Sequence, residues 1–279
     1  MNNKKLSWFM SCMLFVSFLL GTARFRSFAQ MGPFLSPLQV PQAKTEEEYD
    51  AYLEILTSEN PEQTVARVKS FARNFPKSQL LGLAFEHEML AYQRLQEWFN
   101  VLHSGQKALQ LEPRNVMTLL TVAAAIINGI HNQTIDHSLL DEAEQYAVES
   151  IQELGTMTIP HQLSLERWER IRGDMEGQAH EILGEIAVIQ GNNQKARKEF
   201  EASIRANPDP HGVQFLRLGL LSESLGNDEQ ASQAFGRAIE LGPESVRNLA
   251  RRELQKIQSG WAGQAMTRDK QTVKTTPPK

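Results

Sequence analysis

Apolar side chains recur at helical spacing along most of the chain. Residues 45–57 place apolar side chains on one helical face, and residues 61–75 do so again after an Asn-Pro start. The same spacing of three to four residues continues in later segments, at 78–113, 114–128, 139–154, 164–190 and 246–257. No segment shows the sustained period-two alternation of a strand. This pattern predicts an all-α protein.

The clearest pattern lies between residues 177 and 245, where one unit is followed by a near copy of itself. The same residue types return after 35 residues, in the pairs Gly184 and Gly219, Gly191 and Gly226, Ala196 and Ala231, Phe200 and Phe235, Ser203 and Ala238, and Pro208 and Pro243. Small residues let two helices approach closely, and proline ends a helix. We expect the two phenylalanines to fill the space toward the next hairpin. A fixed period of this length predicts stacked helical hairpins.

These residues resemble the tetratricopeptide repeat, a helix–turn–helix unit of about 34 residues. The segments 177–210 and 212–245 each carry Leu-Gly, Ala, Phe and Pro in the order of that family. The resemblance implies an α-solenoid of helix–turn–helix hairpins over residues 45–258. An earlier unit departs from the pattern, because Met89 stands at the small position and Gly105 at the aromatic one.

The resemblance also implies where a partner would bind, because in that family the first helix of each hairpin lines a concave groove that holds a peptide. The corresponding positions here are Glu86, Leu90, Gln93, Gln178, Glu181, Glu185, Val188, Val213, Leu216, Leu220 and Glu223. Family members that clamp a C-terminal carboxylate need Lys and Asn there, whereas glutamates would repel it. A mixed apolar and acidic groove suits a basic or amphipathic segment. The alternative is that these glutamates are only a solvated helix face.

Residues 1–29 have the layout of a secretory signal peptide. Two lysines precede an apolar run over residues 6–20, and small residues occupy the cleavage positions that end at Ala29. This layout predicts a bacterial protein that is periplasmic or secreted. The two arginines after the run support an alternative, an uncleaved inner-membrane anchor over residues 6–22. Residues 30–44 are rich in proline and predict a linker, and the polar residues 259–279 predict a disordered tail.

Composition narrows the classes of partner. The first 29 residues hold four basic residues and no acidic one, which leaves 25 basic and 33 acidic residues in the remainder. An acidic surface disfavours nucleic acid, and a membrane contact is expected only through an uncleaved signal segment. The single cysteine, Cys12, lies in the signal segment, so the remainder has no disulfide, thiol nucleophile or thiolate metal site.

The polar residues show no catalytic or cofactor motif. Phosphate loops, dinucleotide fingerprints, nucleophile elbows and zincin motifs are all absent from the sequence. We therefore expect no catalytic residue, no cofactor and no metal, and predict a non-catalytic scaffold that binds a protein or peptide. One alternative is an assembly or quality-control factor for outer-membrane proteins. A second is a hydrolase with its site in the interrupted third unit, where His131 and His137 flank a long loop.

Overall fold

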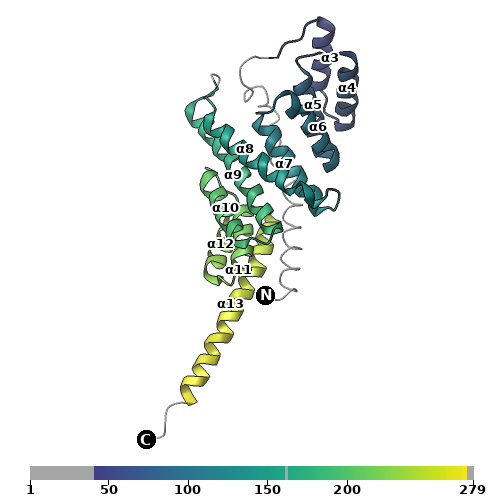
Figure 1. The fold of residues 1–279 in the computed structure, drawn as a ribbon. Coiled ribbons are helices and arrows are strands. Elements are labelled where there is room, and N and C mark those ends of the chain that lie inside the picture. The colour runs from purple at the N-terminus through teal and green to yellow at the C-terminus, as the bar shows by residue number, and fades with distance from the viewer. Residues whose placement is uncertain (1–40, 161–162, 275–279) are drawn as a thin grey trace.

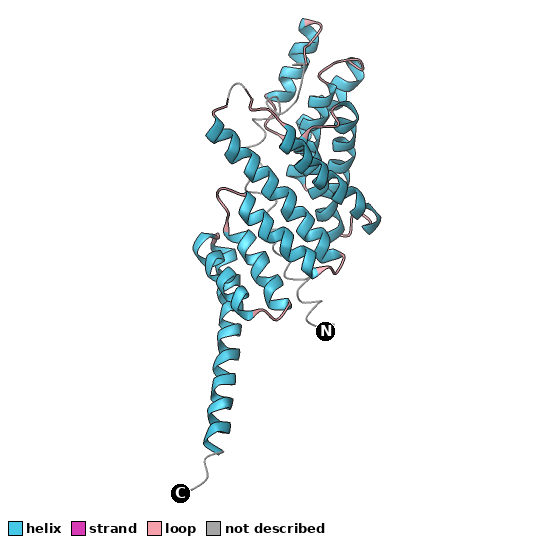
Figure 2. Ribbon diagram, turned by 60° about the vertical axis from the view of Figure 1, so that its left-hand side comes forward, coloured by secondary structure: helices cyan, strands magenta, loops and turns pink. Residues whose placement is uncertain are grey.

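The computed structural model describes residues 41–160 and 163–274 of the 279-residue chain. Within this part of the chain the ordered elements are α-helices and one short 3-10 segment, and no strand is present (Figure 2). The predicted signal peptide, the possible anchor over 6–22 and most of the linker lie outside the described residues. The all-α prediction is confirmed.

Consecutive helices pair as hairpins. The elements are α3 (Glu46–Leu56), α4 (Pro61–Asn74), α5 (Leu81–Leu95), α6 (Trp98–Leu111), α7 (Val116–His131), η1 (His137–Leu139), α8 (Leu140–Thr156), α9 (Leu165–Ile189), α10 (Asn193–Ala206), α11 (Gly212–Ser224), α12 (Asp228–Leu241) and α13 (Glu244–Lys274). The five hairpins are α3/α4, α5/α6, α7/α8, α9/α10 and α11/α12. Figure 1 shows them stacked in chain order, with α13 extending beyond the last one. The prediction of an α-solenoid is confirmed.

Some first helices of neighbouring hairpins contact each other directly. Contacts join α3 to α5 and α7 to α9, and α13 contacts α11 in the same way. We call the surface formed by α3, α5, α7, α9 and α11 the first-helix face. It is the surface on which the sequence placed a partner.

The small positions of the repeat are sites of close helix contact. A Cβ atom built on Gly184 would lie 2.4 Å from the ring of Phe200, and one built on Gly219 would lie 2.6 Å from the ring of Phe235. Each ring thus packs on the glycine of its own hairpin, 16 residues earlier, and fills the space between α9 and α10 or between α11 and α12. The two glycines occupy equivalent environments, as the repeat predicts.

The turns inside the two clear repeats are built alike. Gly191 and Gly226 adopt left-handed φ values of 73° and 76°, which glycine reaches without steric cost. The asparagine that follows each of them caps the next helix, because the side chains of Asn192 and Asn227 accept hydrogen bonds from backbone N–H groups in the first turn.

The prediction of a disordered tail over residues 259–279 is wrong for residues 259–274, which continue α13 to Lys274. The polar composition after residue 258 suggested that no helix could be stabilised. A helix that is already nucleated needs only residues of adequate propensity to continue, and Gln, Ala, Met, Arg and Lys are common here. No proline follows Pro243 until Pro277. Residues 275–279 lie outside the described part.

Candidate partner-binding face

The eleven predicted groove residues all lie on first helices, but they differ in burial. Five of them are buried in the packing between helices: Glu86, Gln93, Val213, Leu216 and Leu220. These five cannot be open groove positions, and the prediction is wrong for them. A first helix inside a solenoid contacts its own hairpin and both neighbours, so most of its circumference is covered. The other six are partly exposed: Leu90, Gln178, Glu181, Glu185, Val188 and Glu223.

Glu86 is a buried carboxyl group in α5. Its Oε2 accepts a hydrogen bond of 3.4 Å from the side-chain amide of Asn115, which begins α7. Burial, with a smaller contribution from the nearby charge of Glu112, raises the pKa of Glu86 to about 7. This side chain couples α5 to α7 and is withheld from a partner.

Arg217 joins α11 to α9. Its guanidinium forms ion pairs with Glu181 through Nη1 and with Glu185 through Nη2. The two carboxylates are four residues apart, so they project from the same side of α9. Arg217 is 1% exposed. Removing one partner of such a buried ion-pair network strongly destabilises the protein, because the remaining charges stay buried.

This ion pairing changes the charge expected on the first-helix face. Glu181 and Glu185 were predicted as two acidic groove positions, but they share the positive charge of Arg217. Each glutamate side chain remains 12% exposed. The three side chains together keep one net negative charge, half of what the sequence alone indicated. This still favours a basic ligand over an acidic one.

Four buried polar atoms of α7 and α11 have no hydrogen-bond partner among the described residues. They are Thr118 Oγ1 and His131 Nδ1 of α7, and Arg217 Nε and Ser222 Oγ of α11. Burial is the main cause that lowers the pKa of His131, opposed by Glu185 and assisted by Arg217 and His137. Buried polar atoms are nearly always hydrogen-bonded in native proteins. All four atoms are enclosed by the protein itself, so they lie within the packing of α7 and α11 and are not open to a ligand on the first-helix face.

Sequence reasoning missed Arg217, His131, Thr118 and Ser222. The repeat contained a signal for Arg217, since it lies 36 residues after Glu181 and 32 after Glu185, close to one period of 35. A charge about one repeat beyond an opposite charge lies on the neighbouring first helix. For the other three residues no sequence signal was present, because a lone Thr, Ser or His on a helix is common.

The interrupted third unit holds the other predicted chemistry. His131 ends α7 and is half-buried, whereas His137 is exposed in η1. Asp136, between them in the sequence, caps η1 by accepting a hydrogen bond of 2.7 Å from the N–H of Ser138. Among the described residues, no group of three or more His, Cys, Asp or Glu could hold a metal ion. Over the same residues, no helix combines the length and apolar content that a bilayer span requires.

Comparison with known proteins identifies the repeats. A family model described as the tetratricopeptide repeat matches residues 177–210 and 215–245. These two segments are tetratricopeptide repeats. The first matched range coincides with the unit predicted at 177–210, and the second begins three residues later than the unit predicted at 212–245. Tetratricopeptide repeats are generally modules for protein–protein interaction, and proteins built from them are typically non-catalytic scaffolds.

A solved structure shows the same fold, and a second is similar at a lower score. MamA (RS-1 ArsTM double mutant) is 13% identical, and the match covers 71% of this chain and 96% of that chain with a TM-score of 0.54. A thermophilic TPR protein of Thermus thermophilus is 14% identical over 76% of this chain and 95% of that chain, with a TM-score of 0.44. No curated protein matches the chain.

Proposed function

We propose that this tetratricopeptide repeat protein is an exported, non-catalytic scaffold that binds a basic or amphipathic polypeptide on the first-helix face of α7, α9 and α11. The observation that carries the proposal is the partly exposed, negatively charged group of Glu181 and Glu185 with Arg217 at the junction of α9 and α11. The net negative charge of the Arg217 ion pairs favours a basic segment.

Peptide selection tests the binding proposal. A library of random peptides would be selected against the wild-type chain, and enriched peptides would be measured by fluorescence anisotropy. We expect enrichment of Lys and Arg among apolar residues. Glu185→Gln keeps an acceptor for Arg217 but removes one charge, so affinity should fall by about fivefold to tenfold, or roughly 1 kcal/mol.

Glu229→Gln is the matched control, because Glu229 is an exposed glutamate at the start of α12, a second helix. It should leave the affinity unchanged. Selection of acidic peptides, or equal effects of the two substitutions, would contradict binding on the first-helix face. Failure of the library to yield any binder would contradict the proposal as well.

The export part of the proposal has its support in the sequence of residues 1–29. Cell fractionation followed by mass measurement of the recovered chain tests it. We expect a chain that begins at Gln30 in the periplasm or medium. A full-length chain in the inner membrane would favour the anchor over residues 6–22 instead, and a full-length chain in the cytoplasm would contradict export.

A further inference from the structure

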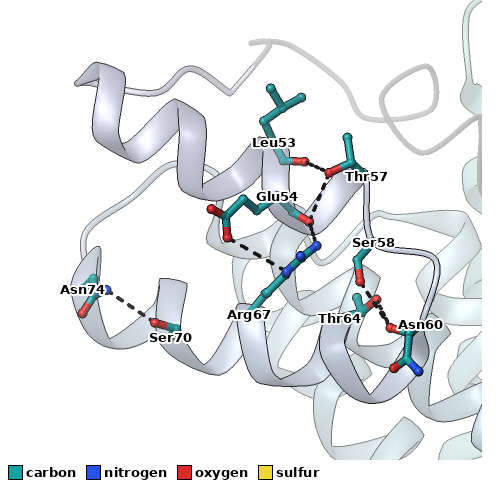
Figure 3. A network of polar contacts seen from close by, with 9 residues as sticks. All are labelled: Leu53, Glu54, Thr57, Ser58, Asn60, Thr64, Arg67, Ser70 and Asn74. Carbon is teal, nitrogen blue, oxygen red and sulfur yellow. Dashed lines mark hydrogen bonds and ion pairs between the residues drawn. The ribbon is translucent and has the colours of Figure 1, made fainter.

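The helix α3 carries an exposed apolar stripe. Tyr49, Leu53 and Leu56 are 55%, 40% and 48% exposed, and their spacing places them on one side of the helix. Tyr52 and Ile55, on another side of the same helix, are buried. Figure 3 shows the side chain of Leu53 pointing away from α4. The hairpin contact with α4 therefore leaves the stripe exposed.

The position of α3 in the stack is one that suits a further helix. Each later first helix packs against the second helix of the preceding hairpin: α5 against α4, α7 against α6, α9 against α8, and α11 against α10. Among the described residues no helix precedes α3. The apolar residues of the stripe are separated by four and then three residues, which is the spacing by which one helix packs along another. The stripe thus has the form of a surface that binds a helix.

An acidic row borders the stripe. Glu46 and Asp50 are exposed, and Asp50 lies three residues before Leu53, on the neighbouring part of the helix surface. Glu54 lies farther round, on the side of α4, where it contacts Arg67 at 4.0 Å (Figure 3). Acidic residues in the first turn also stabilise the start of a helix, but Asp50 lies beyond that turn. The row therefore adds negative charge beside the apolar surface.

We propose that the apolar stripe and acidic row of α3 bind an amphipathic helix of another protein, one that carries a stripe of large apolar side chains with Lys or Arg beside it. The apolar side chains of the partner cover Tyr49, Leu53 and Leu56, and its cations face Glu46 and Asp50. The bound helix adds to this end of the stack, as a second helix does before each later hairpin. The site lies on α3, so the inference is independent of binding on α7, α9 and α11.

Charge favours such a partner over a second copy of the chain. Two α3 helices packed together would bring acidic residues near one another, because the first turn alone holds Glu46, Glu47 and Glu48. Like charges oppose that pairing, whereas Lys and Arg favour association. The same negative charge disfavours an anionic membrane surface.

The length of α3 sets the strength of the contact. Its 11 residues span about 16 Å, so a helix bound along it makes a short contact. A stable interface buries about 800 Å² per partner, which is more than three side chains provide. We therefore expect reversible binding, with a Kd of about 10–100 μM.

Two synthetic helical peptides test the proposal on the full chain. Both have about 18 residues, enough to form a helix, with leucines separated alternately by three and four residues. One peptide has lysines beside the leucines, and the other has glutamates at the same positions. Binding is measured by fluorescence anisotropy. We expect the lysine peptide to bind about ten times more tightly than the glutamate peptide, and this preference to shrink at about 0.5 M salt because screening weakens the charge interactions.

Substitutions in α3 locate the bound peptide. Leu53→Ser removes apolar surface and Asp50→Lys reverses one charge, so each should weaken binding of the lysine peptide by about fivefold or more. Leu225→Ser and Glu229→Lys are the matched controls, because Leu225 is 39% exposed at the end of α11 and Glu229 is exposed at the start of α12. Both controls should leave the affinity unchanged. Circular dichroism verifies that each variant keeps the helix content of the wild type.

Three results would overturn the proposal. Binding of neither peptide, or equal binding of both, would show that α3 does not select a basic helix. Equal losses in the α3 variants and in the controls would place the peptide elsewhere on the chain. A dimer of the chain alone that Leu53→Ser abolishes, measured by analytical ultracentrifugation, would assign the stripe to a second copy.

Discussion

Gly219 lies where the ring of Phe235 meets α11, so an added methyl group would approach the ring to 2.6 Å. We expect Gly219→Ala to cost about 1–3 kcal/mol of the free energy of unfolding, because overpacking displaces the ring or the helix. Gly236 is the matched control, since it lies inside α12 and a Cβ there meets nothing within 4 Å. Gly236→Ala should stabilise by up to about 1 kcal/mol through helix propensity. Urea denaturation distinguishes the two, and similar effects would contradict close packing at Gly219.

Glu86 should make stability depend on pH. Its pKa is about 7 in the folded chain, against an ordinary value of 4.5. The folded state therefore holds a proton that the unfolded state releases, and the free energy of unfolding should fall as pH rises from about 4.5 to about 7. Glu86→Gln removes this dependence and should stabilise the chain by about 1–3 kcal/mol at pH 8. Denaturation at pH 5 and pH 8 measures it.

The exposed Glu229 gives the comparison for this pH dependence. Glu229→Gln should leave the difference in the free energy of unfolding between pH 5 and pH 8 as it is in the wild type. A difference unchanged by Glu86→Gln would show that Glu86 is solvated or otherwise ionised in the folded chain. A carboxylate in an ion pair has the opposite effect, because the stability that it contributes to the folded chain is lost as pH falls.

At the scale of the helices, Arg217 is the main polar link between α9 and α11. Arg217→Met leaves Glu181 and Glu185 close together without their cation, and it should cost about 3–5 kcal/mol. The triple variant with Glu181→Gln and Glu185→Gln should recover much of this loss. Arg237→Met breaks an exposed pair with Glu240 at 2.5 Å and should cost less than about 1 kcal/mol. Thermal and urea unfolding would compare all three, and a loss from the triple variant equal to that from Arg217→Met would contradict this account.

The helices themselves were largely predictable, whereas the side of each first helix that meets solvent was not. Asn192 and Asn227 were predictable as caps because capping depends on local backbone geometry. Burial of Leu216 and Leu220 depends on neighbours that lie a full repeat away in the sequence. The packing of Met89 and Gly105 was likewise not predictable from either residue alone. The sulfur of Met89 lies 3.0 Å from a Cβ built on Gly105, so this hairpin reverses the sizes of the glycine–phenylalanine pair over the same interval of 16 residues, which no single position reveals.

For the whole molecule, α13 closes the stack, and its removal tests how far one unit supports the next. Val246, Leu249, Ala250 and Ile257 of α13 join the core of α11 and α12. A chain that ends at Pro243 loses these contacts, which contribute on the order of 5 kcal/mol, whereas a control that ends at Gly260 keeps them. Because each repeat contacts only its neighbours, hydrogen exchange should accelerate in α11 and α12 while α5 to α7 keep their protection. Equal acceleration along the entire chain would mean that the hairpins fold as one cooperative unit, and the nearest-neighbour description of this solenoid would then be wrong.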